Sequence, residues 1–150
     1  MAKGDLHAVI RLNKLEIDEL RRQIGVLLRE ESDLVARDRA LDEALARESR
    51  LADKHPEAAY TFPAFLTAHR QRKADLAEAL ADVRARIETT RESLAELYRR
   101  RKTYELAQDA RDKRAEQERA RKDQAVLDEV GLTMHRRRRA EDGEDGIGDE

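Results

Sequence analysis

Apolar side chains recur at alternating steps of three and four residues along two long stretches of this chain, and this seven-residue repeat limits the possible folds. In the first stretch, residues 6–54, position a of the repeat holds Ile10, Ile17, Ile24 and Leu45. Position d holds Leu6, Leu20, Leu27, Leu34 and Leu41. Ile at a with Leu at d is typical of two-stranded coiled coils. Polar residues interrupt this seam at Asn13, Glu31 and Asp38, which weakens it and offers a way to fix its register.

The second stretch begins near Ala64 and carries the same repeat. Its a positions are Leu66, Leu80, Ile87 and Leu94, and its d positions are Leu76, Val83, Leu97 and Tyr104. A repeat of seven that persists over many turns indicates a coiled coil, because a single amphipathic surface helix does not require it.

Between the two stretches lie both prolines of the chain, Pro56 and Pro63, within a segment that is rich in aromatic residues. Proline interrupts a helix because it lacks the backbone donor and clashes with the preceding turn. We therefore predict a loop over residues 55–63, with Pro63 at the first position of the second helix and Thr61 or Phe62 at its cap. The predicted fold class is all-α: two long helices that form an antiparallel coiled-coil hairpin.

The predicted second helix, residues 64–135, is longer than the first. At 1.5 Å per residue the first spans about 70 Å and the second about 108 Å, which leaves an unpaired overhang from about residue 107. From Ala107 to Ala125 no apolar side chain is larger than alanine. Larger apolar residues then return as Val126, Leu127, Val130, Leu132 and Met134. Gly131 marks a predicted weak point or helix end.

Charge is unevenly distributed along the chain. Charged residues make up 43% of it and aromatic residues only 3%, a composition typical of long helices and coiled coils. Residues 99–139 carry 14 basic and 8 acidic side chains, whereas residues 140–150 carry 6 acidic and no basic ones. We predict that residues 136–150 form an arginine run followed by a disordered acidic tail.

The sequence does not predict an enzyme, a metal site or a cofactor. There is no cysteine, so a disulfide scaffold and a cysteine nucleophile are excluded. The four histidines, His7, His55, His69 and His135, are far apart, and no glycine-rich nucleotide loop follows a strand. No apolar run is long enough to span a membrane and the N-terminus lacks a signal peptide, so the expected location is cytoplasmic, without membrane insertion.

Two groups of residues are candidate docking surfaces. At the open end of the hairpin, Val9, Leu12, Leu15 and Val26 lie off the a and d positions and join the apolar residues of the overhang. At the turn end lie Tyr60, Phe62, Phe65, Leu66 and His69. For each group, burial within the hairpin is the alternative, and for Phe65 and Leu66 it is the one we favour. Aromatic side chains are nevertheless frequent interface anchors.

A different function class is a basic coiled coil that binds nucleic acid through residues 99–139. Four adjacent arginines, Arg136–Arg139, could release counterions from a phosphate backbone. However, six acidic residues follow within eleven positions, and no aromatic residues alternate with the arginines to stack on bases. A solvated, partly neutralised charge cluster is the interpretation that we prefer.

One charged stretch near the end of the predicted pairing, Tyr98-Arg99-Arg100-Arg101-Lys102-Thr103-Tyr104-Glu105, leads on to Ala125-Val126-Leu127-Asp128-Glu129-Val130-Gly131. Together with the hairpin layout over residues 5–139, this resembles the FliJ family of bacterial flagellar export. Leu127, Asp128 and Glu129 match the family's motif, whereas the acidic tail lies outside the family pattern.

The resemblance implies an antiparallel coiled coil that acts as the central stalk of the hexameric flagellar export ATPase. It further implies contact with the cytoplasmic domain of the export gate and with export chaperones, at the inner-membrane export apparatus. The expected ATPase contacts are Val9, Leu12, Leu15, Tyr98, Tyr104, Leu127, Asp128, Glu129 and Val130. The expected gate contacts are Tyr60, Phe62, Phe65, Leu66 and His69. The equivalent stalk of a virulence secretion system is the close alternative.

Overall fold

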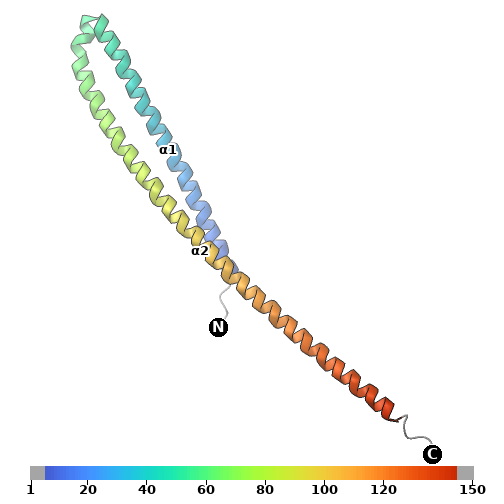
Figure 1. The fold of residues 1–150 in the computed structure, drawn as a ribbon. Helices are drawn as coiled ribbons and strands as arrows, with labels where there is room; N and C mark the ends of the chain where they lie inside the picture. Colours follow the sequence, from blue (N-terminus) through green and yellow to red (C-terminus); the bar gives the residue numbers. More distant parts are fainter. Residues whose placement is uncertain (1–5, 145–150) are drawn as a thin grey trace, which may run out of the picture. The chain divides into compact units, whose positions relative to one another are not determined.

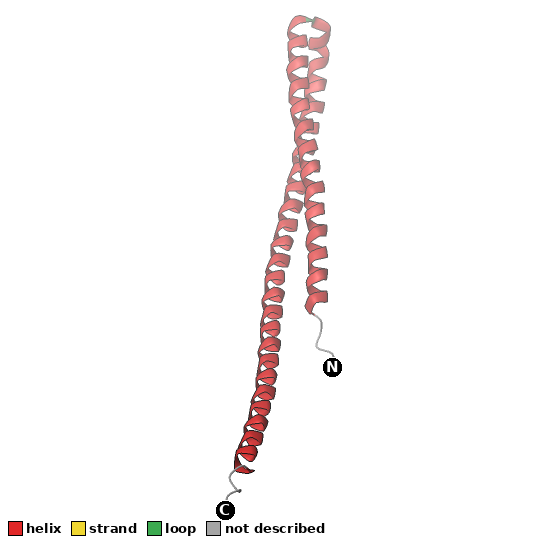
Figure 2. Cartoon of the chain, turned by 90° about the vertical axis from the view of Figure 1, so that its right-hand side faces the viewer, coloured by secondary structure: helices red, strands yellow, loops and turns green. Residues whose placement is uncertain are grey.

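A computed structural model describes residues 6–144 of the chain, all of them helical except His55. Helix α1 runs Leu6–Lys54 and helix α2 runs Pro56–Glu144. The chain divides into two compact units between Lys102 and Thr103. In the first unit α1 and the first half of α2 lie side by side as an antiparallel pair (Figures 1 and 2). The predicted helical hairpin with a longer second helix is therefore confirmed.

The hairpin core follows the seven-residue repeat. Every a and d position from 6 to 52 in α1 and from 62 to 101 in α2 is buried or half-buried. The eight side chains that are almost fully buried all occupy these positions: Asn13, Ile17, Leu27, Leu34, His69, Val83, Ile87 and Leu97. Four of them, Leu27, Leu34, Val83 and Ile87, form one cluster against which Leu76, Ala79 and Leu80 pack. Apolar burial is thus confined to one seam between two helices.

Polar contacts across the seam fix how the two helices are aligned. Lys73 Nζ, at an a position, lies 2.7 Å from Asp38 Oδ1 and 3.0 Å from Asp42 Oδ1. Arg84 Nε lies 2.8 Å from Glu31 Oε1. Asn13 Nδ2 donates to the carbonyl oxygen of Leu97 over 3.2 Å.

In these contacts the residue number falls on α1 as it rises on α2, which is the signature of antiparallel pairing. A shift of the pairing would separate these charged and polar partners. The polar residues that interrupt the apolar repeat therefore find partners in the opposite helix.

The connection between the helices is shorter than predicted. The prediction of a loop over residues 55–63 is wrong, because only His55 lies outside the helices and α2 begins at Pro56. His55 serves both helices: its N–H donates to the carbonyl of Leu51, and its carbonyl accepts from the N–H of Ala59, each over 3.0 Å. Pro56 disfavours the helical conformation at the preceding residue and itself suits a first helical position.

Pro63 therefore lies inside α2 instead of starting it. The ring removes one backbone donor, so it costs the helix one hydrogen bond, but it does not end the helix. The hydroxyl of Thr67 donates to the carbonyl of Pro63 over 3.1 Å, and the hydroxyl of Thr61 donates to that of Ala58 over 3.1 Å. These side chains hydrogen-bond to backbone oxygens on either side of the proline.

The second unit consists of α2 from Thr103 onwards, which we call the extension (residues 103–144). Every side chain from 109 to 143 is exposed. Local pairs along the helix replace a core: Arg121 Nη2 lies 2.8 Å from Glu118 Oε1, and Gln124 Nε2 donates to Asp128 Oδ1 over 2.9 Å. Such pairs each add a few tenths of a kcal/mol to a helix.

The predicted end of the second helix near His135 is also wrong, because α2 passes through Gly131 and the arginine run to Glu144. One glycine costs a helix about 1 kcal/mol relative to alanine, which is too little to stop it between strong helix formers. The Thr133 hydroxyl donates to the carbonyl of Glu129 across this glycine over 2.9 Å. Of the predicted disordered tail, residues 140–144 are helical, and residues 145–150 lie outside the described part of the chain.

Shortening a core side chain should destabilise the hairpin strongly. Ile87 is 4% exposed, and Ile87→Ala removes its contacts with the core cluster and leaves a cavity. We expect the free energy of unfolding to fall by about 3 kcal/mol, measured by urea denaturation followed by circular dichroism. Leu127→Ala, in the exposed extension, is the control and should change it by less than about 0.5 kcal/mol. Equal losses for both variants would contradict a single buried seam.

The Lys73 ion pairs should make stability depend on pH in the alkaline range. Hydrogen bonds to Asp38 and then to Asp42 raise the pKa of Lys73 above its ordinary value of 10.5, although partial desolvation opposes this. Their stabilisation is therefore fully present below pH 10.5 and is lost as the pH rises through the raised pKa. Thermal melts of the wild type and Lys73→Gln between pH 8 and about 12 should show the steeper decline in the wild type. Parallel curves would contradict this role.

Candidate functional site

The first candidate surface lies at the open end of the hairpin, opposite the turn. On α1 the side chains of Val9, Leu12 and Leu15 are exposed, and Leu15 is 64% exposed. Val26 continues the stripe of Leu12 and Leu15 along the same face, since these positions recur at helical spacing. Tyr98 on α2 is also more than a third exposed. Burial within the hairpin does not account for these side chains, so they are available to a partner.

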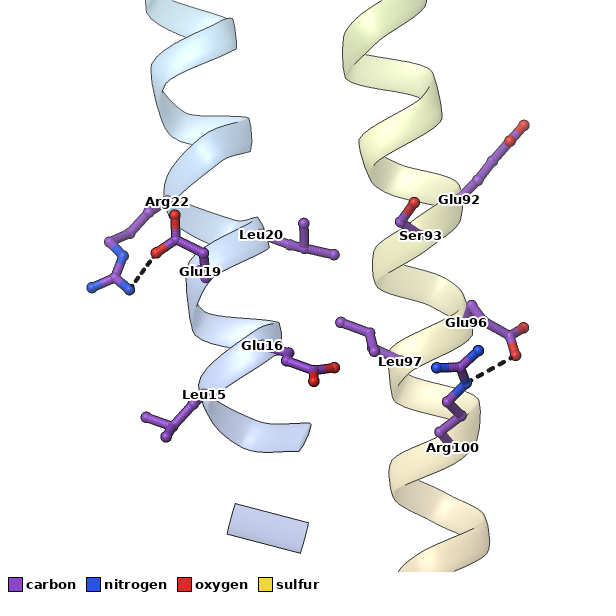
Figure 3. A pocket seen from close by; sticks show the side chains of 10 residues that line it. All are labelled: Leu15, Glu16, Glu19, Leu20, Arg22, Glu92, Ser93, Glu96, Leu97 and Arg100. Atoms are coloured by element: carbon purple, nitrogen blue, oxygen red, sulfur yellow. Dashed lines mark hydrogen bonds and ion pairs between the residues drawn. The ribbon is translucent and has the colours of Figure 1, made fainter. Parts of the chain in front are cut away.

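Between the helices at this end runs a groove, which we call the open-end groove. One part of it, of about 860 Å³, is lined by Leu15, Glu16, Glu19, Leu20, Arg22, Glu92, Ser93, Glu96, Leu97 and Arg100. The adjoining part, of about 560 Å³, shares Glu19 and Arg22 and continues along Val26, Leu27, Ala85 and Thr89. Figure 3 shows Leu20 of α1 and Leu97 of α2 pointing toward each other between the helices. The groove thus has an apolar floor and charged edges.

Small residues on α2 open the groove. Ala85, Thr89 and Ser93 follow one another at steps of four on the wall of the groove. The hydroxyl of Thr89 donates to the carbonyl of Ala85 over 3.0 Å, and that of Ser93 donates to the carbonyl of Thr89 over 3.1 Å. Because both hydroxyls are already bonded to the backbone, covering this wall does not leave them without partners. The heptad pattern alone does not predict this groove, although small residues at steps of four on α2 are visible in the sequence.

Most of the charged edge of the groove is internally paired. Arg22 Nη2 lies 2.6 Å from Glu19 Oε2, and Arg100 Nε lies 3.4 Å from Glu96 Oε1 (Figure 3). The hydrogen bond from Arg22, supported by one from Gln23, lowers the pKa of Glu19, so this carboxylate stays ionised at neutral pH. Glu16 and Glu92 have no hydrogen-bond or ion-pair partner among the described residues. Two carboxylates of the groove are thus uncompensated.

The second candidate surface is an apolar stripe on the extension, formed by Val126, Leu127, Val130 and Met134. All four side chains are exposed, Leu127 to 64%. A shallow hollow of about 250 Å³ runs along this face and is lined by Val126, Glu129, Val130, Thr133, Met134 and Arg137. Within the described chain nothing covers the stripe, since every side chain from 109 to 143 is exposed.

The remaining predicted contact residues of the extension differ in environment. Glu129 lines the hollow, whereas Asp128 accepts a hydrogen bond from Gln124 of the preceding turn. Tyr104, at the beginning of the extension, is half-buried. The structure therefore groups Leu127, Glu129 and Val130 on or beside one surface, and it places Val9, Leu12, Leu15 and Tyr98 in the hairpin unit.

The third candidate surface is the aromatic cluster at the turn end. The rings of Phe62 and Phe65 stack with centroids 6.4 Å apart, and those of Phe65 and His69 stack at 6.3 Å. Phe62, Leu66 and His69 occupy d and a positions, and His69 is only 6% exposed. Tyr60, in contrast, is 88% exposed. Most of this cluster closes the end of the seam, and Tyr60 is its accessible member.

No metal-binding cluster accompanies these surfaces in the described residues. Between residues 6 and 144 no three side chains of the His, Asp and Glu types are close enough to hold a metal ion. Neither α1 nor α2 contains, within its described length, an apolar stretch that could cross a bilayer.

Replacing the buried histidine should stabilise the hairpin. The Nδ1 atom of His69 is buried without a hydrogen-bond partner among the described residues, which costs free energy. We expect His69→Leu to raise the free energy of unfolding by about 1 kcal/mol in urea denaturation at neutral pH. Tyr60→Leu, the exposed control, should leave it unchanged. A destabilised His69→Leu variant would show that the imidazole has a polar partner in solution.

Comparison with known proteins identifies a family for the chain. A protein-family model described as "Flagellar FliJ protein" matches residues 2–140, which is nearly the whole chain. No curated protein and no solved structure matches the chain.

Proposed function

Because the chain belongs to the FliJ family of flagellar proteins, components of the flagellar export apparatus, we propose that it is a non-enzymatic stalk that binds the export ATPase. In this role it enters the hexameric ring of the ATPase, promotes assembly of the ring and couples it to the export gate. It carries out no chemistry of its own. The match to a flagellar family favours this role over the equivalent stalk of a virulence secretion system.

The observation that carries the proposal is the uncovered extension. A helix of 42 residues, from Thr103 to Glu144, is maintained without a core and with every side chain from 109 to 143 in solvent. Large exposed apolar side chains on a charged helix indicate a protein interface. A helix of about 63 Å whose side chains from 109 to 143 are all exposed suits insertion among the subunits of a ring.

We assign the ATPase contact to two sets of exposed residues. On the hairpin these are Val9, Leu12, Leu15 and Tyr98, and on the extension they are Tyr104, Leu127, Asp128, Glu129 and Val130. Burial of the apolar members would supply most of the binding free energy, while Asp128 and Glu129 would provide specificity.

We assign the opposite end of the hairpin to the cytoplasmic domain of the export gate. Tyr60 is the first residue to test there, because its side chain is exposed and amphipathic. Phe62, Phe65, Leu66 and His69 would act mainly by holding this end in shape, since they stack or lie in the seam. Export chaperones would bind the remaining exposed apolar surface, on the cytoplasmic side of the inner membrane.

The test measures ATP hydrolysis and hexamer formation by the cognate export ATPase with added stalk protein. We expect the wild type to increase both. Val130→Glu places a charge on the apolar stripe. It should raise the concentration of stalk protein that gives a half-maximal effect by about tenfold or more, as expected for an interface anchor. Leu132→Glu is the matched control, because Leu132 is equally exposed but lies off the stripe, and it should stay within about twofold of the wild type.

Two results would count against the proposal. One is an ATPase whose hydrolysis and assembly are unaffected by the wild-type protein. The other is an equal loss for Val130→Glu and Leu132→Glu, which would mean that the charge disturbs the helix and does not mark a surface.

A further inference from the structure

The open-end groove and the extension carry complementary unsatisfied groups. The groove has an apolar floor at Leu20 and Leu97, an exposed apolar edge at Leu15, and the uncompensated carboxylates Glu16 and Glu92. Its two parts together are lined by four carboxylates and three arginines, and the excess of negative charge lies in the part around Glu16 and Glu92, which has four carboxylates and two arginines.

The extension has the opposite character. Arg136–Arg139 are all exposed and form no ion pair with a described residue. They follow directly on the apolar stripe, and Arg137 lines the same hollow as Val126, Val130 and Met134. This segment is therefore an amphipathic helix with an apolar face and a basic end.

The two surfaces also match in length. Along α1 the groove extends from Leu15 to Leu27, which is about 18 Å of helix. The segment Val126–Arg137 is about 17 Å long. The small side chains of Ala85, Thr89 and Ser93 leave room on the groove wall for a third helix to approach closely.

We propose that the open-end groove of one copy of this chain binds the extension of a second copy, residues 126–139, as a third helix. The apolar stripe packs against Leu15, Leu20 and Val26, and the arginines pair with Glu16 and Glu92. If each copy donates its extension to the other, the two interfaces are equivalent and the assembly closes as a dimer.

This inference does not rest on the proposed function. It does bear on it, because the dimer covers Leu15, Leu127 and Val130, which we assign to the ATPase contact. The self-associated form would keep these apolar surfaces covered until the ATPase competes for them.

Sedimentation equilibrium of the full chain tests the proposal. We expect a concentration-dependent monomer–dimer equilibrium at tens of micromolar in about 50 mM salt, weakened in about 500 mM salt because the rim contacts are electrostatic. The variant Glu16→Lys/Glu92→Lys should raise the dissociation constant at least tenfold. Glu43→Lys/Glu78→Lys is the matched control, since both residues are exposed, lie outside the grooves and undergo the same change of charge.

A charge exchange between two variants tests whether the occupant is the extension. Arg137→Glu/Arg138→Glu should dissociate like the groove variant, because its extension then repels the groove. Mixing the two dissociated variants in equal amounts should restore the dimer, since each groove then meets an extension of opposite charge. Circular dichroism of each variant checks that helix content is retained.

Each arm of the experiment can overturn the proposal. If the wild type stays monomeric at 200 µM, the dimer is excluded. Docking of the extension onto the groove of the same chain would also give a monomer, so it counts as this outcome. A dimer that persists in the groove variant, or that is lost equally in the control, shows that another surface or net charge is responsible. Failure of the mixed variants to associate, when both retain their helix content, excludes the extension as the occupant.

Discussion

Burial of the a and d side chains between α1 and α2 is the interaction on which the rest of this structure depends. Among the described residues, the side chains that are most deeply buried all lie in the seam. An antiparallel helix pair of this kind has a large surface for its size, so it offers long faces to partners. The thin core and the proposed interaction role both follow from this composition.

The seam contains polar residues where larger apolar ones would be more stabilising. Asn13 is 4% exposed, its amide donates to Leu97, and its Oδ1 atom has no partner among the described residues. Lys73 occupies an a position and contacts two aspartates of α1. Buried polar groups of this kind reduce stability but select one alignment, as in coiled coils generally. A uniformly apolar seam could slide by a heptad, and the proposed stalk role would require a fixed register.

The helices could be predicted from the sequence because a heptad pattern and helix propensity agree along Leu6–Lys54 and through most of α2. The connection could not, because both Pro56 and Pro63 are strong interrupters in isolation and only the packing decides which one starts a helix. The continuation of α2 past Gly131 depends on many small contributions from local side-chain pairs and helix propensity, and no single residue predicts it. Among the candidate surfaces, the exposed apolar residues at the open end were apparent from their heptad positions. The open-end groove was not, because it arises from side chains of two helices, Glu16 and Glu92 among them, whose proximity depends on the register.

The one-residue connection at His55 has a consequence for the order in which the hairpin forms. Contacts near it join residues that are close in sequence, such as Asp42 and Lys73, whereas Glu31 and Arg84 are 53 residues apart and Asn13 and Leu97 are 84 apart. The loop-closure entropy of each new contact is small once its neighbour toward the turn has formed, so pairing should propagate from His55 outward like a zipper. The same logic makes the N-terminal turns of α1 the first to separate in the native state. The end of the hairpin that carries the exposed side chains of Val9, Leu12 and Leu15 is therefore also the end that opens at the lowest free energy.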